Sequence, residues 1–294
     1  MRPITRSSLT AAALVGAMVV MWILLVPPQA GPDERDHLVR GGALVRGELE
    51  GQEPPYRGTR VGFELPAWVD KPNPDCYKFE PGIPVECSTS RPLPEGERVL
   101  GTRAIDYQVW GHLLPGVGTY APSSVSLTAS RMLDAMFPVA ALGVVFAVAA
   151  RRGWLALGAS VLAVTPMAWF MFAVVNPSGL VIAGGLLMWT AFVAAERAPP
   201  RLQAWMVAIG WAMMTLPRRD GLVWAVLGLS LALLVLQRGF LDTWRSLGLW
   251  PQVVLAGSTV ATLLWAVTSD SNDSMALLVA PLVPVVAALA RRAW

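Results

Sequence analysis

Long apolar segments alternate with short polar connections along most of this chain. The first apolar segment carries no charge from Ser7 to Ala30, and further segments follow one long polar connection. A helix of about 20 apolar residues crosses a bilayer and satisfies its own backbone hydrogen bonds there. The pattern predicts an all-α polytopic membrane protein with about eight transmembrane helices. The predicted spans cover residues 9–28, 130–150, 154–175, 178–195, 202–217, 221–237, 249–268 and 274–291.

Composition and charge agree with this class and indicate an orientation. Of 294 residues, 54% are hydrophobic and only 15% are charged, which excludes an ordinary soluble domain. Arginines gather in alternate connections, so the positive-inside rule predicts that both termini are cytoplasmic. Because the basic residues follow this topology, we expect no nucleic-acid partner. These arginines are Arg2, Arg6, Arg151, Arg152, Arg197, Arg201, Arg238, Arg245, Arg291 and Arg292. A signal peptide cleaved after Ala30 is the alternative interpretation of the first span.

The polar connection of about a hundred residues divides the chain into three regions. Residues 1–28 hold the first helix, residues 29–129 form an extracytoplasmic loop domain, and residues 130–294 form a bundle of about seven helices. The loop contains most of the acidic residues and several proline clusters. Proline forbids long helices, so we expect rigid loops and turns with little apolar core. Its segment 99–120 carries interfacial aromatic residues.

Both cysteines of the chain, Cys76 and Cys87, lie in this loop. Because the loop faces the oxidising side, a disulfide between them is the natural interpretation. A metal-binding pair is the alternative, although no further metal ligands lie nearby in the sequence. The disulfide would close a short loop and stabilise the domain.

Titratable residues crowd the junction directly behind the first span, in the order Pro32-Asp33-Glu34-Arg35-Asp36-His37. The pattern predicts a helix that begins at Pro32, with its acids in the first turn where the helix dipole favours anions. Helical spacing would place Asp33, Asp36 and His37 on one face and turn Glu34 away. Helix capping explains these residues, and catalysis or ligand binding is the alternative.

Other polar residues near the membrane have structural interpretations as well. Asn176-Pro177-Ser178-Gly179 is typical of a tight turn, with Asn176 facing a substrate as the alternative. Arg131 and Asp134 have the spacing of an ion pair at the membrane surface. Aromatic anchoring at the interface explains Tyr107, Trp110 and His112, which could instead line a groove for an acceptor.

Three of these motifs together resemble one family. They are Pro32-Asp33-Glu34 with His37, Ser130-Arg131-Met132-Leu133-Asp134-Ala135, and Val164-Thr165-Pro166-Met167 followed by Val175-Asn176-Pro177-Ser178-Gly179-Leu180. The combination is similar to the DUF2142 family of bacterial membrane proteins, which is related to the GT-C glycosyltransferases. Members are usually longer, so this chain is expected to be short at its C-terminal end. The resemblance covers roughly residues 10–235.

The resemblance implies a GT-C-like fold in a bacterial plasma membrane and a sugar donor on a polyprenyl phosphate or diphosphate. The sugar would pass to a cell-envelope glycan on the extracytoplasmic side. An acid in the first extracytoplasmic loop would serve as catalytic base or metal ligand, a role that falls on Asp33 or Glu34. His37 would orient that carboxylate, contact substrate or join it in binding a divalent metal, Mg or Mn.

A lipid phosphate needs cations on the same side of the membrane. Arg218 and Arg219, between the fifth and sixth predicted spans, fall on the extracytoplasmic side and are the candidate phosphate-binding residues. The alternative is a re-entrant hairpin that leaves both arginines cytoplasmic. The sequence leaves open the sugar, the acceptor, the metal dependence, whether the chain acts alone and its oligomeric state.

Two other functions compete with glycosyl transfer. A non-catalytic membrane protein or complex subunit would bind an envelope partner through the extracytoplasmic loop. A transporter would show charged or broken spans and an internal repeat, and the sequence offers only Pro166 in the third span.

Overall fold

The structure of the protein is a computed structural model. It describes residues 4–55, 57–69, 80, 82–88, 95–193, 198–236 and 240–268. The chain divides into two compact units. The junction unit consists of Gly16–Phe137 and Pro166–Gly179, and the helical unit consists of Met1–Val15, Pro138–Thr165 and Leu180–Trp294.

Helices occupy the first seven predicted spans. They are α1 (Ile4–Leu25), α4 (Ser126–Arg152), α5 (Trp154–Ala163) with α6 (Pro166–Phe172), α7 (Ser178–Val193), α8 (Pro200–Thr215), α9 (Gly221–Val235) and α11 (Leu249–Thr268). Among the described residues, only α4 and α11 are long and apolar enough to cross a membrane, and α5 with α6 makes a third if the broken pair is one span. Eight spans are therefore not confirmed, and the predicted span 274–291 lies outside the described residues.

The third predicted span is broken at a proline. Helix α5 ends at Ala163, and α6 begins at Pro166. Proline lacks the backbone N–H and clashes with the preceding turn, so a helix ends before it while a new one can begin there. The sequence motif around Pro166 therefore divides this span into two short helices.

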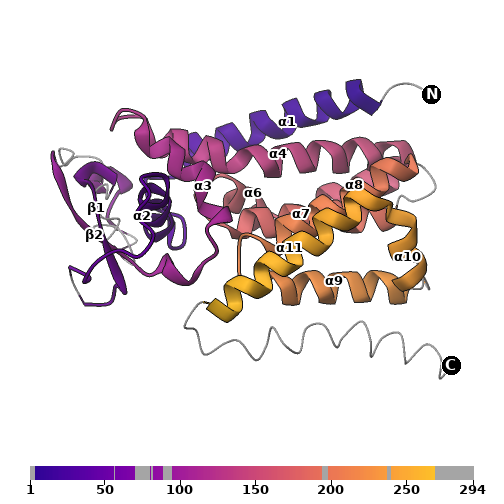
Figure 1. Ribbon diagram of the computed structural model, residues 1–294. Coiled ribbons are helices and arrows are strands. Elements are labelled where there is room, and N and C mark those ends of the chain that lie inside the picture. Colours follow the sequence, from indigo (N-terminus) through magenta and orange to yellow (C-terminus); the bar gives the residue numbers. More distant parts are fainter. Residues whose placement is uncertain are drawn as a thin grey trace. The chain divides into compact units, whose positions relative to one another are not determined.

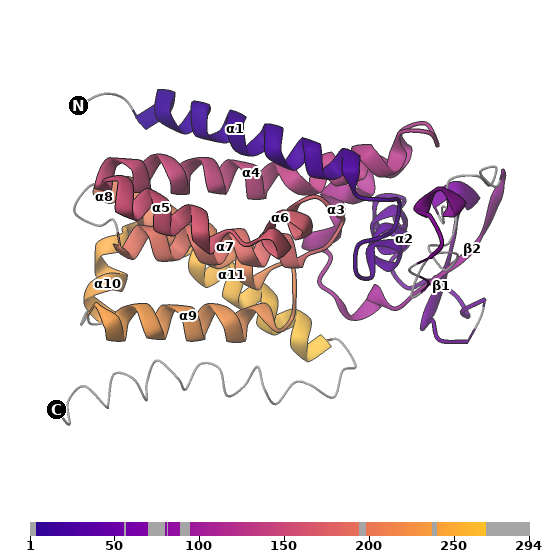
Figure 2. The same cartoon turned by 180° about the vertical axis from the view of Figure 1, so that it is seen from behind.

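Small residues and hydroxyl groups pack the helical unit. A Cβ atom added to Gly184 of α7 would lie only 2.6 Å from the carbonyl oxygen of Gly210 in α8, so these two helices approach closely. The Thr262 hydroxyl of α11 donates to the Thr215 carbonyl of α8 at 3.0 Å. Helix α10 (Phe240–Leu247) lies between the ends of α9 and α11 in both views (Figures 1 and 2).

The junction unit contains a two-stranded sheet, which the all-helical prediction did not include. Strands β1 (Val61–Pro66) and β2 (Glu97–Thr102) are antiparallel, with a register that runs from Val61 opposite Thr102 to Pro66 opposite Glu97. The sheet packs beside α2 (Glu34–Val45) (Figure 1). The other short elements are η1 (Ala67–Val69), η3 (Val85–Ser88), η4 (Ala104–Asp106), α3 (Trp110–Val117) and η5 (Gly118–Tyr120).

A hydrophobic core joins α2 to this sheet, so the expectation of little apolar core in the loop is wrong. Alternate side chains of each strand point to one face of a sheet, and here that face is buried against the helix. The cluster consists of Leu38, Val39, Ala43, Phe63, Leu65, Val69, Leu100, Leu127 and Val175. Helix α3 lies on another side of α2, where Gly41 allows the His112 carbonyl to approach. The prolines shorten the elements of this region without preventing a core.

Candidate functional site

Arg131 of α4 holds the segment between α1 and α2. Its Nε and Nη2 donate to Glu34 Oε1 and Oε2 at 2.7 and 2.8 Å. Its Nη1 donates to the carbonyls of Ile23 and Val26 at 3.2 and 2.7 Å, and Nη2 donates to the Pro27 carbonyl at 2.7 Å. A guanidinium group has five N–H donors, and all five are used here. The end of α1 and the start of α2 are thus bonded to one side chain.

Glu34 is the buried anion of this arrangement. The residue is 0% exposed, and its Oε1 also accepts the backbone N–H of Val175 at 3.0 Å. A buried carboxylate needs such hydrogen bonds because removing it from water is otherwise very unfavourable. Both oxygens of Glu34 therefore serve to join three segments of the junction unit.

Asp134 does not pair with Arg131, so the prediction of that ion pair is wrong. Its Oδ2 accepts the backbone N–H of Asn176 at 3.1 Å. The Asn176 side chain donates from Nδ2 to the Pro32 carbonyl at 2.8 Å and accepts the Ser178 backbone N–H at 2.9 Å. The bond between Asn176 and Ser178 forms the local turn that the sequence predicted. The bonds to Asp134 and Pro32 connect this turn with α4 and with the segment before α2.

The segments that carried the family resemblance therefore meet in one hydrogen-bonded network. Glu34, Arg131, Asp134 and Asn176 come from three separate parts of the chain, with 97 residues between Glu34 and Arg131 and 42 between Asp134 and Asn176. All four are at least nine-tenths buried. We call these four residues the junction network. It holds the linker 26–33 by its carbonyls at the α1 end and at Pro32.

Asp33 lies beside this network with an exposed side chain. Its backbone is left-handed, with φ at 54°, and its side chain makes no capping hydrogen bond with α2. Helix α2 begins at Glu34, so the predicted start at Pro32 is wrong. Asp33 consequently does not share a helix face with His37, which is buried.

His37 and His112 form a buried pair between α2 and α3. Their Nδ1 and Nε2 atoms are 2.9 Å apart, and His112 Nδ1 lies 3.1 Å from the Gln108 carbonyl oxygen. A carbonyl only accepts, so His112 donates from Nδ1 and its Nε2 accepts from His37. The Tyr107 ring meets both imidazoles edge-on. The interfacial interpretation of His112 is therefore wrong, whereas Trp110 is exposed.

Burial determines the charge of His112. Burial lowers the pKa of His112 to about 4, and the positive charge of Arg40 lowers it further, against the effect of the Gln108 carbonyl. Arg40 is itself 2% exposed, and burial lowers its pKa to about 10. At neutral pH, His112 is neutral while Arg40 stays protonated. His112 therefore braces α2 against α3 in its neutral form, through its hydrogen bond with His37.

The residues predicted to hold a metal do not come together as a ligand set. Glu34 is committed to Arg131, and His37 is bonded to His112. In the described part of the chain, no group of three or more His, Cys, Asp or Glu side chains could hold a metal ion. The geometry does not fit Mg or Mn at Asp33, Glu34 and His37.

Arg218 and Arg219 belong to the helical unit, in the connection between α8 and α9. Arg218 already pairs with a carboxylate, since its Nε and Nη2 donate to Asp220 at 2.8 and 3.3 Å. The role of the two arginines in binding phosphate stays a prediction. Cys87 lies in η3 and Cys76 lies outside the described residues, so the predicted disulfide lies outside them as well.

Sequence reasoning did not identify one polar residue of the linker, Gln29. Its backbone is also left-handed, with φ at 56°, and its side chain is 5% exposed. Gln29 and Asp33 are the only non-glycine residues with positive φ in the described ranges. A glutamine after two prolines carries no sequence signal for this conformation.

Long apolar helices and a separate unit with a buried polar network define a helical membrane protein. Comparison with known families agrees. The chain belongs to the family described as predicted membrane protein (DUF2142), whose family model matches residues 17–291. No curated protein and no solved structure matches the chain.

Proposed function

We propose that this protein is a GT-C-like glycosyltransferase in which Asp33 is the catalytic base. The supporting observation is the state of Asp33: an exposed carboxylate in a left-handed backbone conformation, between two residues fixed by the junction network. Few non-glycine residues adopt this conformation, Asp and Asn most often among them, and where one does the surrounding structure commonly enforces it, often at functional sites. The network supplies that enforcement through Pro32 on one side and Glu34 on the other.

The proposed reaction uses Asp33 to take a proton from an acceptor hydroxyl. As the proton moves to the carboxylate, the hydroxyl oxygen bonds to the anomeric carbon of the donor sugar. The bond from that carbon to the phosphate oxygen breaks, and the polyprenyl phosphate or diphosphate leaves with the electron pair. A carboxylate suits this role because its oxygens can accept a proton, and the Asp33 side chain is exposed at the surface of the protein.

Glu34 has a different part in the proposal. Its oxygens accept three hydrogen bonds inside the protein, from two Arg131 nitrogens and one backbone N–H. A proton acceptor needs access to substrate, which Glu34 lacks at 0% exposure. We therefore assign Glu34 the positioning of Asp33.

The setting of the reaction is proposed on sequence grounds. The donor would reach the site from a bacterial plasma membrane, with both termini cytoplasmic and the acceptor glycan on the other side. Arg218 and Arg219 are the proposed contacts for the donor phosphate, and Arg218 would exchange its ion pair with Asp220 for the phosphate. An Arg can bond two phosphate oxygens in parallel.

A non-catalytic role in binding an envelope partner is the second candidate. An open hollow of about 470 Å³ in the junction unit supports it. Three carboxylates line this hollow, from Glu48, Glu50 and Glu64. A partner with a basic surface would suit this charge.

Transfer assays with the full chain in lipid nanodiscs test the proposal. The probe is undecaprenyl phosphate carrying a radiolabelled hexose or pentose, with an envelope glycan extract as acceptor. We expect Asp33→Asn to lower transfer by about 10²- to 10⁴-fold, the usual contribution of a general base, while thermal unfolding stays close to wild type. Asparagine tolerates the left-handed conformation, so the backbone is preserved.

The matched control is Asp36→Asn, which changes a nearby acid that accepts the Arg103 backbone N–H. This variant should transfer sugar as wild type does. Full transfer by Asp33→Asn would remove Asp33 as the base. The binding role is favoured by two results together: the wild-type protein transfers no sugar, and cells from which this protein is deleted lose another protein from the envelope.

A further inference from the structure

Gln29 has an unusual environment in the linker between α1 and α2. Its side chain is 95% buried, and neither Nε2 nor Oε1 has a hydrogen-bond partner within the described part of the protein. A buried amide without partners is unfavourable, so native proteins rarely keep one without a reason. The backbone of Gln29 is held in place, because Arg131 bonds the Val26 and Pro27 carbonyls just before it.

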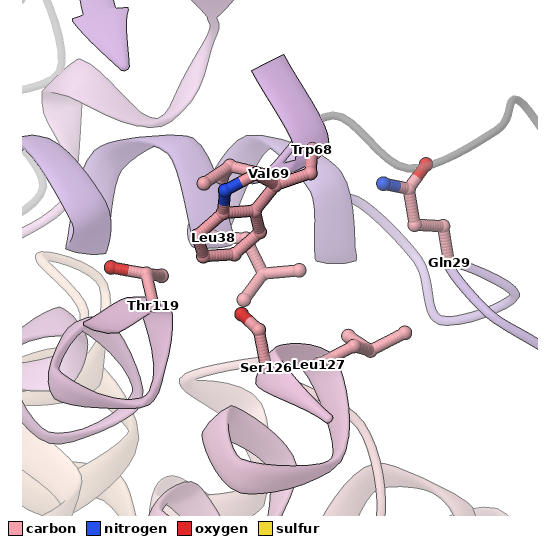
Figure 3. A pocket seen from close by; sticks show the side chains of 7 residues that line it. All are labelled: Gln29, Leu38, Trp68, Val69, Thr119, Ser126 and Leu127. Atoms are coloured by element: carbon pink, nitrogen blue, oxygen red, sulfur yellow. The ribbon is translucent and has the colours of Figure 1, made fainter. Parts of the chain in front are cut away.

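The Gln29 side chain faces a small pocket in the junction unit (Figure 3). The pocket has room for about one water molecule. In the close-up, Gln29 lies on one side and Thr119 on the other, with the Trp68 indole between them. The lining residues are Gln29, Leu38, Trp68, Val69, Thr119, Ser126 and Leu127.

The chemistry of this lining is neutral. No lining residue is charged, which argues against a phosphate, a carboxylate or a cation as the occupant. Thr119 is already committed, since its hydroxyl donates to the Gly116 carbonyl and accepts from Arg46. The Gln29 amide therefore offers a donor and an acceptor side by side, and Ser126 adds a hydroxyl.

A hydroxyl group complements such an amide, because it also donates and accepts one hydrogen bond. The free space admits one hydroxyl and excludes a whole ring, so the rest of the ligand stays outside. Trp68 is only partly buried, and its indole provides a flat apolar face for the C–H groups of a ring. A polyhydroxylated ring that inserts one hydroxyl matches both features.

We propose that the pocket at Gln29 and Trp68 binds one hydroxyl of a sugar ring. This inference rests on the proposed function for its ligand class, and it adds a sugar subsite four residues before Asp33 in the same linker. The hydroxyl fills a space of the size of one water molecule. The sugar belongs either to the lipid-linked donor or to the acceptor glycan.

Fluorine NMR of the full chain in nanodiscs, labelled with 5-fluorotryptophan, tests the subsite. The chain has 13 tryptophans, and Trp68→Phe assigns the relevant signal. The probes are methyl glycosides of mannose, galactose and arabinose, and undecaprenyl phosphate mannose. We expect a saturable shift of the Trp68 signal with at least one probe. A methyl glycoside response indicates the acceptor, and a response to the lipid-linked probe alone indicates the donor.

Three variants connect the shift to the amide. Gln29→Leu removes both polar atoms at similar size, and we expect sugar binding to weaken about tenfold, the effect of losing one to two hydrogen bonds. If Gln29→Leu does not fold, Ser126→Ala removes the other hydroxyl of the pocket, and sugar binding should weaken in that variant as well. The matched control Gln52→Leu changes an exposed glutamine of the same unit and should bind as wild type does.

The outcomes separate this inference from the proposed function. No saturable shift with any probe, or an equal shift in Gln29→Leu and wild type, overturns the subsite and leaves a pocket for water. Binding does not need the base, so Asp33→Asn should retain the Trp68 shift. Binding without transfer by the wild type supports the subsite and contradicts the glycosyltransferase.

Discussion

The two units of this protein bury different kinds of polar groups. In the junction unit, the buried residues include the charged or titratable side chains Glu34, His37, Arg40, His112, Arg131 and Asp134. In the helical unit, the buried polar side chains of the described residues are hydroxyls, from Thr215, Ser230, Ser258 and Thr262. A hydroxyl can bond to its own helix, whereas a buried charge needs partners from elsewhere.

This difference indicates how each unit is specified. Helices in the helical unit can pack wherever small residues let their backbones approach, as at Gly184 and Gly210. In the junction unit, by contrast, the segments are held in position because all five donors of Arg131 and both oxygens of Glu34 form hydrogen bonds. Chemistry that needs fixed geometry is therefore expected in the junction unit.

Loss of Arg131 should be the most damaging change. Arg131→Met leaves the Glu34 carboxylate buried without its cation, and we expect a loss of about 3–5 kcal/mol in the free energy of unfolding. Unfolding of the purified protein in detergent measures it. Arg152→Met, which changes an exposed arginine of the same helix, is the control and should change stability by less than about 0.5 kcal/mol. Equal stability of the two variants would contradict the junction network. The double variant with Glu34→Met should recover part of the loss.

A packing change tests the helical unit in the same way. The Cβ of Gly221→Ala would overlap the Met214 carbonyl oxygen, so we expect a loss near the upper end of overpacking costs, about 3 kcal/mol. The control Gly257→Ala lies in α11, and no atom of the described residues is within 4 Å of the added Cβ. That change should stabilise the helix by up to about 1 kcal/mol. A similar loss in both variants would show that close packing at Gly221 is not the cause.

Acid should weaken the junction unit through the histidine pair. Burial lowers the pKa of His112 to about 4 from its ordinary value of about 6.5, so the unfolded chain binds more protons between these values. Stability is then complete above pH 6.5 and falls as the pH drops, by about 2 kcal/mol at pH 5. Unfolding measured at pH 7.5 and pH 5 checks this. His112→Gln should flatten the dependence, and an unchanged slope in that variant would assign it to other groups.

The smallest effect concerns the backbone at Asp33. Glycine adopts φ of 54° without strain, and alanine does not, so Asp33→Ala should be less stable than Asp33→Gly by about 1 kcal/mol. Both variants lack the carboxylate, which removes its charge from the comparison. Thermal unfolding of the two proteins decides the point. If alanine is the more stable replacement, the left-handed conformation of Asp33 is not retained in solution.

The helical class, the positions of several helices and the family were predicted from the sequence and are confirmed, whereas the number of eight spans is not. Apolar segments located α1, α4, α7, α8, α9 and α11 within a few residues, because a segment in hydrocarbon must bond its own backbone. Membership in the DUF2142 family, inferred from three short motifs, is also confirmed. The roles of individual motif residues were harder to predict, as Arg131 and Asp134 show. Their spacing allowed an ion pair, but each found a partner in a distant segment.

By itself the sequence determined the class of this protein, its helices and the crowding of charge behind the first span. Those features depend on local composition and spacing. Only the tertiary structure decided which carboxylate is buried and which is exposed: Glu34 meets Arg131 and Val175, and Asp33 remains at the surface. The physical reason is that burial and pairing depend on residues about a hundred positions away, which adjacent carboxylates in a sequence cannot reveal.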